Sequence, residues 1–107
     1  MTWTIEILNE TVVDELQALP NDMFARFERI SQLIESHGLE KVHEPHIKHL
    51  EGDLWEMRLK GRDGISRAIY VTATPKRVVV VRVFIKKTQK TPRREINLAL
   101  KRSKEVE

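Results

Sequence analysis

The chain is expected to fold as an α+β domain in which helices cover one face of a small, mainly antiparallel sheet. Apolar residues recur at helical spacing across residues 9–38, whereas residues 54–85 fall into three runs with the alternation of strands. The connections between those runs are too short for parallel crossovers, which need a dozen or more residues. The predicted order is β-α-α-β-β-β-α, in a single domain spanning residues 1–107.

The first elements are a strand and a helical hairpin. Residues 3–8 alternate with period two, which predicts a short strand. Asn9 and Thr11 are candidate N-caps for a first helix that Pro20 ends. These signals place two helices in close succession, so the pair should present one shared apolar face.

The second helix has the clearest pattern in the chain. Asn21 or Asp22 is expected to cap it, and Gly38 suits the backbone conformation that ends a helix. Its apolar stripe consists of Met23, Phe24, Phe27, Ile30, Leu33 and Ile34.

Sheet follows helix after a polar connection over residues 39–53. The three predicted strands cover residues 54–60, 65–72 and 77–85. Thr91 and Pro92 then predict the start of a last helix, with Thr91 as its cap and Pro92 in its first position.

Charge is divided unevenly along the chain, although the net charge is only +3. Residues 1–57 carry 4 Lys and Arg against 12 Asp and Glu, a balance of −8. Residues 58–107 carry 15 against 4, a balance of +11. Such asymmetry suggests a polyanionic partner for the basic half, either nucleic acid or an acidic protein.

Strand alternation predicts where the positive charges lie. Trp55 and Tyr70 fall on the core parity, together with Val81 and Val83, so packing is favoured over base stacking for the two aromatic rings. The opposite parity is expected to form an open basic face, made of Arg58, Lys60, Arg67, Arg82 and Lys86.

The segment after the last strand extends this basic field with ammonium groups, hydroxyls, an amide and a helix N-terminus, all suited to phosphate oxygens. Lys87 is a candidate catalytic residue beside Lys86. The candidate RNA-binding residues are Arg62, Arg82, Gln89, Lys90, Arg93 and Arg94.

Composition excludes several other kinds of site. The chain has no cysteine, which excludes disulfides, thiolate zinc sites and cysteine nucleophiles. His43, His46 and His49 have three-residue spacing, but Pro45 interrupts the segment and loop polarity explains them better than a metal. We therefore expect no metal and no cofactor. A signal peptide and a membrane-spanning run are both missing from the sequence, so a cytoplasmic location is expected.

Residues 54–60 (LWEMRLK), residues 64–70 (GISRAIY) and the valine-rich strand together resemble the RelE/ParE toxin superfamily. The ending FIKKTQKTP at residues 84–92 is similar to its phage-derived HigB-like branch. The resemblance implies the toxin of a type II toxin–antitoxin system that cleaves messenger RNA on the ribosome. It also implies a cognate antitoxin, of helix-turn-helix type, and a toxin–antitoxin hetero-oligomer.

By position in the family motif, Arg67 is similar to the arginine that grips phosphate, and Arg58, Lys86 and Lys87 lie near other basic positions. The C-terminal region has neither the tyrosine nor the histidine that several relatives carry there. Proton transfer is therefore left open among Glu56 and the lysines, since arginine is a poor base. Replacing Arg67 with alanine is expected to abolish growth arrest without unfolding the protein.

Two other functions fit the same pattern. A ParE-like protein would inhibit DNA gyrase by binding protein and would cleave nothing. A non-catalytic module would use the basic face only to bind RNA or DNA, with affinity that falls as salt rises. A translation extract separates these possibilities, because only a ribonuclease cuts the message.

Overall fold

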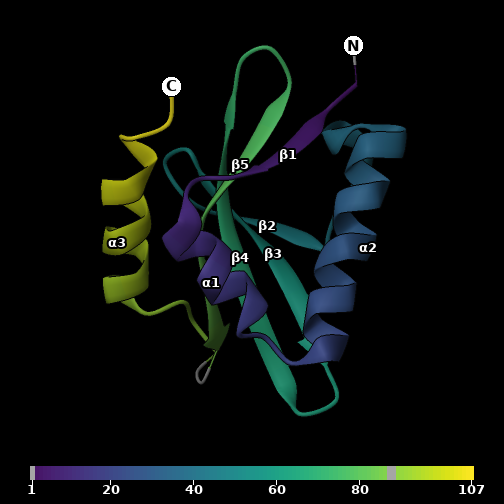
Figure 1. Ribbon diagram of the computed structural model, residues 1–107, viewed down its shortest axis with the longest axis vertical. Helices are drawn as coiled ribbons and strands as arrows, with labels where there is room; N and C mark the ends of the chain where they lie inside the picture. Colours follow the sequence, from purple (N-terminus) through teal and green to yellow (C-terminus); the bar gives the residue numbers. More distant parts are fainter. Residues whose placement is uncertain (1, 87–88) are drawn as a thin grey trace.

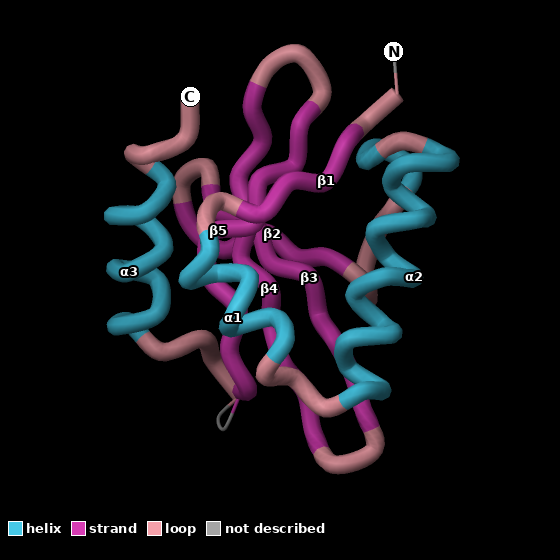
Figure 2. The backbone as a smooth tube through the Cα atoms, viewed as in Figure 1, coloured by secondary structure: helices cyan, strands magenta, loops and turns pink. Residues whose placement is uncertain are grey.

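The computed structural model describes residues 2–86 and 89–107. Within these residues a five-stranded sheet is flanked by three helices and a short 3-10 turn (Figures 1 and 2). The strands are β1 Thr4–Ile7, β2 Ile47–Glu51, β3 Leu54–Gly61, β4 Gly64–Ala73 and β5 Arg77–Lys86. The helical elements are α1 Glu10–Gln17, α2 Asn21–His37, the turn η1 Leu39–Lys41 and α3 Arg93–Ser103.

The strand order across the sheet is β1-β5-β4-β3-β2. Strand β1 runs parallel to β5, and every other neighbouring pair is antiparallel. Figure 1 shows the sheet between α2 on one side and α3 on the other, with α1 in front. The predicted α+β class and helical hairpin are thus confirmed.

The predicted order omits one strand. Strand β2 forms inside residues 39–53, which the sequence presents as a polar connection, and the observed order is β-α-α-β-β-β-β-α. The sequence hides β2 because Ile47 is buried whereas Lys48 and His49 are exposed, so this edge strand offers no alternating pattern. A register shift between His49 and Glu51 shortens the alternation further.

The first two helices differ in whether a side chain caps their start. Asn9 caps α1 as expected, since its Oδ1 accepts a hydrogen bond of 3.1 Å from the Val12 N–H. The expectation that Asn21 or Asp22 caps α2 is wrong, because Pro20 occupies the N-cap position without a side-chain bond. The Asp22 Oδ2 instead accepts a 2.6 Å bond from the Arg62 N–H, which fastens α2 to the β3–β4 turn.

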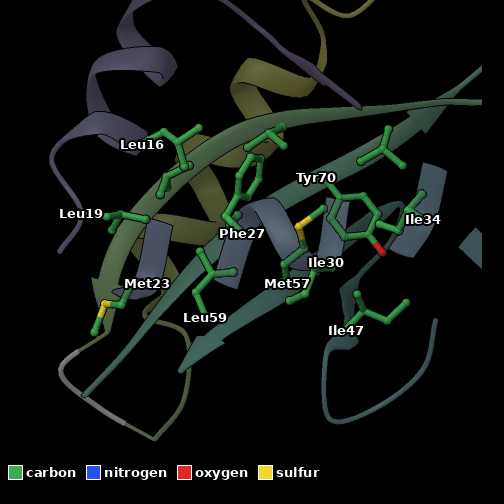
Figure 3. Packing of buried hydrophobic residues seen from close by; sticks show 14 of the residues in the cluster. Leu16, Leu19, Met23, Phe27, Ile30, Ile34, Ile47, Met57, Leu59 and Tyr70 are labelled. Carbon is green, nitrogen blue, oxygen red and sulfur yellow. The ribbon is translucent and has the colours of Figure 1, made fainter. Parts of the chain in front are cut away.

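The main core lies between the sheet and the helices α1 and α2. Figure 3 shows side chains of both helices packed on those of β3 and β4. Met57 and Leu59 are fully buried here, as their parity predicts. Tyr70 is also buried, at 1% exposure, which confirms its predicted core position. The labelled members of this core are Leu16, Leu19, Met23, Phe27, Ile30, Ile34, Ile47, Met57, Leu59 and Tyr70.

A second core covers the sheet face that the sequence leaves open. Ala99 of α3 is fully buried there, against a cluster that includes Leu54, Ile69, Val81 and Phe84. The prediction of an open basic face is therefore wrong over the part of the sheet beneath α3. Aliphatic residues of α3 and of alternate strand positions drive this packing because it removes both from water.

A β-bulge explains why Val81 does not follow its predicted parity. Ile69 pairs with Arg82, and Tyr70 pairs with Val80, so Val81 has no partner of its own on β4. The extra residue shifts the alternation of β5, and Val81 packs in the second core whereas Val83 packs in the first.

The last helix also starts differently from its sequence signals. Pro92 is the N-cap residue of α3 rather than its first helical residue. Thr91 does not cap the helix, because its hydroxyl donates to the Oε1 of Glu56 at 2.8 Å.

Candidate nucleic-acid interface

The sheet register gathers basic side chains from three strands near the β3–β4 turn. Arg58 of β3 lies directly opposite Arg67 of β4. Two residues further along these strands, Lys60 and Lys86 flank Ile65 on either side. We name Arg58, Lys60, Arg67 and Lys86 the basic cluster; it contains every predicted catalytic residue except Lys87, which lies outside the described residues.

Arg67 is the most buried member of the basic cluster. It is only 4% exposed, and its guanidinium forms an ion pair with the fully buried Glu56 carboxylate. The Thr91 hydroxyl donates to the same carboxylate, so residues next to α3 help to hold the pair. Burial lowers the pKa of Arg67 from its usual value. Arg67 is thus fixed beneath the surface of the site, not on an open face.

Lys86 is the half-exposed member of the cluster on β5. Partial burial lowers the pKa of Lys86, and the positive charges of Arg67, Arg58 and Lys48 lower it further. Like charges at such close range repel one another. A bound anion would relieve that repulsion, so the cluster is electrostatically suited to phosphate.

A shallow pocket adjoins the basic cluster beside the end of β3, beyond the residues that pair with β2. Its wall includes Arg58 and Lys60 of the cluster, and the remaining lining residues are Arg26, Pro45, His46 and Ile65. The Arg58 N–H donates to the His46 carbonyl oxygen at 2.8 Å, which brings this loop to the site. The sequence does not indicate Arg26, His46 and Lys48 as site residues. The pairing of the unpredicted strand β2 brings His46 and Lys48 to β3, and the packing of α2 on β3 brings Arg26 there.

Arg82, a predicted RNA-binding residue, is held in a network of ion pairs. Its Nε lies 2.7 Å from Glu95 Oε1, and its Nη1 lies 2.8 Å from Glu15 Oε2. Arg102 of α3 reaches the same Glu15 carboxylate at 3.0 Å. These contacts tie α1, β5 and α3 together, so Arg82 has a structural position within the fold.

The other predicted RNA-binding residues lie on the surface. Arg93 forms a bidentate ion pair with Glu51, with nitrogen–oxygen distances of 2.6 and 2.7 Å. The remaining four residues, Arg62, Gln89, Lys90 and Arg94, are exposed.

The three closely spaced histidines do not converge. The His49 ring contacts the Gly52 carbonyl oxygen at 2.8 Å, while His46 lines the pocket beside Arg58. Within residues 2–86 and 89–107, no group of three or more His, Cys, Asp or Glu residues is arranged to hold a metal ion. In the same part of the chain, no helix combines the length and apolar character needed to cross a membrane.

The sequence of the chain matches that of a known protein family. The model of the family described as phage-derived protein Gp49-like (DUF891) matches residues 14–104. The chain belongs to this family. No curated protein matches this Gp49-like chain.

A solved structure relates the Gp49-like fold to a known toxin. The crystal structure of the archaeal RelE–RelB complex from Pyrococcus horikoshii OT3 contains a chain that is 26% identical, with a TM-score of 0.58. The match covers 81% of this chain and 98% of that chain. The predicted resemblance to the RelE/ParE superfamily is therefore confirmed, and the Gp49-like chain has a RelE-like toxin fold.

Proposed function

We propose that this protein is the toxin of a type II toxin–antitoxin pair and that it cleaves messenger RNA on the ribosome. The observation that carries the proposal is the basic cluster, which gathers Arg58, Lys60 and Lys86 around the buried Arg67 on a RelE-like fold. Cations from three strands lie close together, and only Arg67 among them is paired with a carboxylate in the described residues, which is the arrangement expected of a site that binds phosphate.

The proposed reaction is attack by the ribose 2′-oxygen on the adjacent phosphorus. The new O–P bond gives a 2′,3′-cyclic phosphate, and the bond to the 5′-oxygen breaks. Negative charge grows on the non-bridging oxygens in the transition state, where Arg58 and Lys60 would bind them. Arg67 would add positive potential from below, since its own guanidinium is paired with Glu56.

Proton transfer is assigned to the lysines. Because the pKa of Lys86 is lowered, a larger fraction of its amines is neutral than for an ordinary lysine, and the neutral amine accepts the 2′-hydroxyl proton. The ammonium group of Lys60, on the far side of Ile65, donates a proton to the departing 5′-oxygen. Glu56 is a poor alternative base, because it is fully buried and bonded to Arg67 and Thr91.

A cognate antitoxin is the proposed partner. The related archaeal chain was solved in a complex named RelE–RelB, and a partner of that kind would neutralise this toxin in a hetero-oligomer. We propose a helix-turn-helix antitoxin and a cytoplasmic site of action, where the ribosomes are. A gene for a small DNA-binding protein next to this gene would support the partner.

A translation extract tests the proposed function. Purified protein should cut a defined message within its codons, whereas Arg58→Ala and Lys86→Ala should each slow cleavage about 100-fold or more. Arg29→Ala is the matched control, since Arg29 is an exposed arginine of α2 outside the cluster. Intact message together with loss of gyrase supercoiling would replace the proposal with ParE-like inhibition.

A further inference from the structure

A second recess lies away from the basic cluster, on the face of the sheet that α1 and α2 cover. It is an open groove of about 790 Å³, within the size range of small-molecule sites. Its wall is rich in aromatic and aliphatic side chains, including Trp3, Leu39, Ile47, Trp55 and Tyr70. No step of the proposed cleavage uses it.

Two buried hydrogen-bond donors of the groove lack acceptors within the described residues. The Tyr70 hydroxyl and the Trp3 Nε1 are both buried without a hydrogen-bond partner. Tyr70 belongs to the core near Ile34 and Ile47 (Figure 3), and burial raises its pKa, so the hydroxyl keeps its proton. Buried polar groups in folded proteins are normally paired, and two orphaned donors in one groove indicate a ligand that brings acceptors.

Trp55 provides an exposed aromatic surface at the same groove. It is 38% exposed, contrary to its predicted core position, and it lies at the start of β3 beside His49 of the edge strand β2. The Trp55 and His49 ring centroids lie 4.9 Å apart with planes tilted by 60°. The His49 ring is in turn bonded to the Gly52 carbonyl, which fixes this wall of the groove.

Lys48 links the groove to the basic cluster. It lines the groove, and its charge acts on Lys86 of the cluster. It lies on β2, the edge strand of the sheet, so a chain that crosses this edge would pass from one site to the other. Glu40 and Glu44 line the groove as well, and their carboxylates would keep phosphates on the Lys48 side.

We propose that the groove binds a nucleobase of single-stranded RNA whose phosphates follow Lys48 towards the basic cluster. The base would stack on Trp55, and its ring nitrogen or carbonyl acceptors would receive hydrogen bonds from Tyr70 and Trp3. Every base combines a π-face that can stack on Trp55 with acceptors on its edge for the two donors. The inference rests on the proposed function in taking RNA as the ligand.

The test measures binding of RNA hexamers that carry 2′-O-methyl groups, so that cleavage cannot occur. Replacing Trp55 with leucine should weaken hexamer binding by about 5- to 150-fold, the effect of one lost stacking contact. Trp55→Phe keeps an aromatic ring and should restore most of the affinity. Ile85→Ala is the control, since Ile85 is exposed and apolar but does not line the groove.

Tyr70→Phe tests the hydrogen bond separately from folding. It removes a hydroxyl that has no partner in the free protein, so the unfolding midpoint should not fall, while hexamer binding should weaken about 3- to 10-fold. The Trp3 indole N–H resonance should also shift when the hexamer is added.

Unchanged hexamer affinity in Trp55→Leu would overturn the inference. So would a Trp3 resonance that shifts with the antitoxin but not with RNA, since the groove would then bind protein. The two proposals can fail independently. Hexamer binding through Trp55 without message cleavage refutes only the ribonuclease, whereas message cleavage with unchanged Trp55→Leu affinity refutes only the base site.

Discussion

The Glu56–Arg67 pair offers the sharpest test of how the candidate site is built. Both side chains are buried, and the pair is bridged to the start of α3 by the Thr91 hydroxyl. Removing either charge leaves the other one buried without its partner. Replacing both with apolar residues of similar size removes that penalty, because no charge then remains away from water.

The expected magnitudes follow from burial. Glu56→Leu or Arg67→Met alone should cost about 3–5 kcal/mol of unfolding free energy, as for other buried pairs that lose one member. A domain of this size loses about 4 °C in melting temperature per kcal/mol, so each single variant should melt about 12–20 °C lower. The double variant should lie within about 2 kcal/mol of the parent, because both buried charges are gone.

Urea unfolding followed by circular dichroism provides the measurement, with all four proteins compared as a double-mutant cycle. Additive losses, with the double variant as unstable as the sum of the single variants, would refute the reasoning. The result also matters for growth-arrest assays. Arg67→Ala should unfold part of the protein as well as abolish arrest, contrary to the sequence-based expectation, so the double variant is the better test of Arg67 in the reaction.

Three further predictions concern the surroundings of the site. The folded-state pKa of Lys86 lies below its unfolded value. Between these two pKa values the unfolded chain binds more protons than the folded one, so the free energy of unfolding rises with pH in that range. Lys86→Gln should therefore raise the melting temperature at neutral pH and lose this advantage above pH 10. Gly61→Ala should cost about 1–3 kcal/mol in urea unfolding, because its Cβ would lie 2.8 Å from Asp22 Oδ2 and from Met23 Cγ. Glu15→Ala should cost about 2–3 kcal/mol by the same assay, since it removes one of the acceptors of Arg82 and of Arg102 and the carboxylate that accepts from the Val83 N–H.

Much of the sheet could be predicted because strand alternation is a local property. The side chains of Met57 and Leu59 needed only their own neighbours in sequence to be assigned to the core. Strand β2 could not be predicted in this way, since a short edge strand is defined by pairing with β3 and has a single buried apolar anchor, Ile47. The bulge at Val81 likewise depends on the strand opposite.

The sequence predicts which residues form the candidate site but not how deeply each of them is buried. Alternation placed Arg58, Arg67 and Glu56 on one face, and the register brings the two arginines directly opposite each other. Nothing local to these residues shows that α3 covers part of that face, or that the Thr91 hydroxyl reaches Glu56. Long-range contacts therefore decide which of the basic residues is accessible to a ligand and which is buried.

The uneven charge along the chain predicts a polyanionic partner, but it also serves ion pairs within the fold. Arginines of the basic half pair with glutamates of the acidic half, as in Arg67–Glu56, Arg77–Glu6, Arg82–Glu15, Arg93–Glu51 and Arg102–Glu15. These five contacts neutralise part of the asymmetry and join the helices and the sheet. The cations that matter for an anionic ligand are those without a carboxylate contact among residues 2–86 and 89–107, chiefly Arg58, Lys60 and Lys86. In the proposed function, a small excess of positive charge near the β3–β4 turn, not the large difference between the halves, selects RNA.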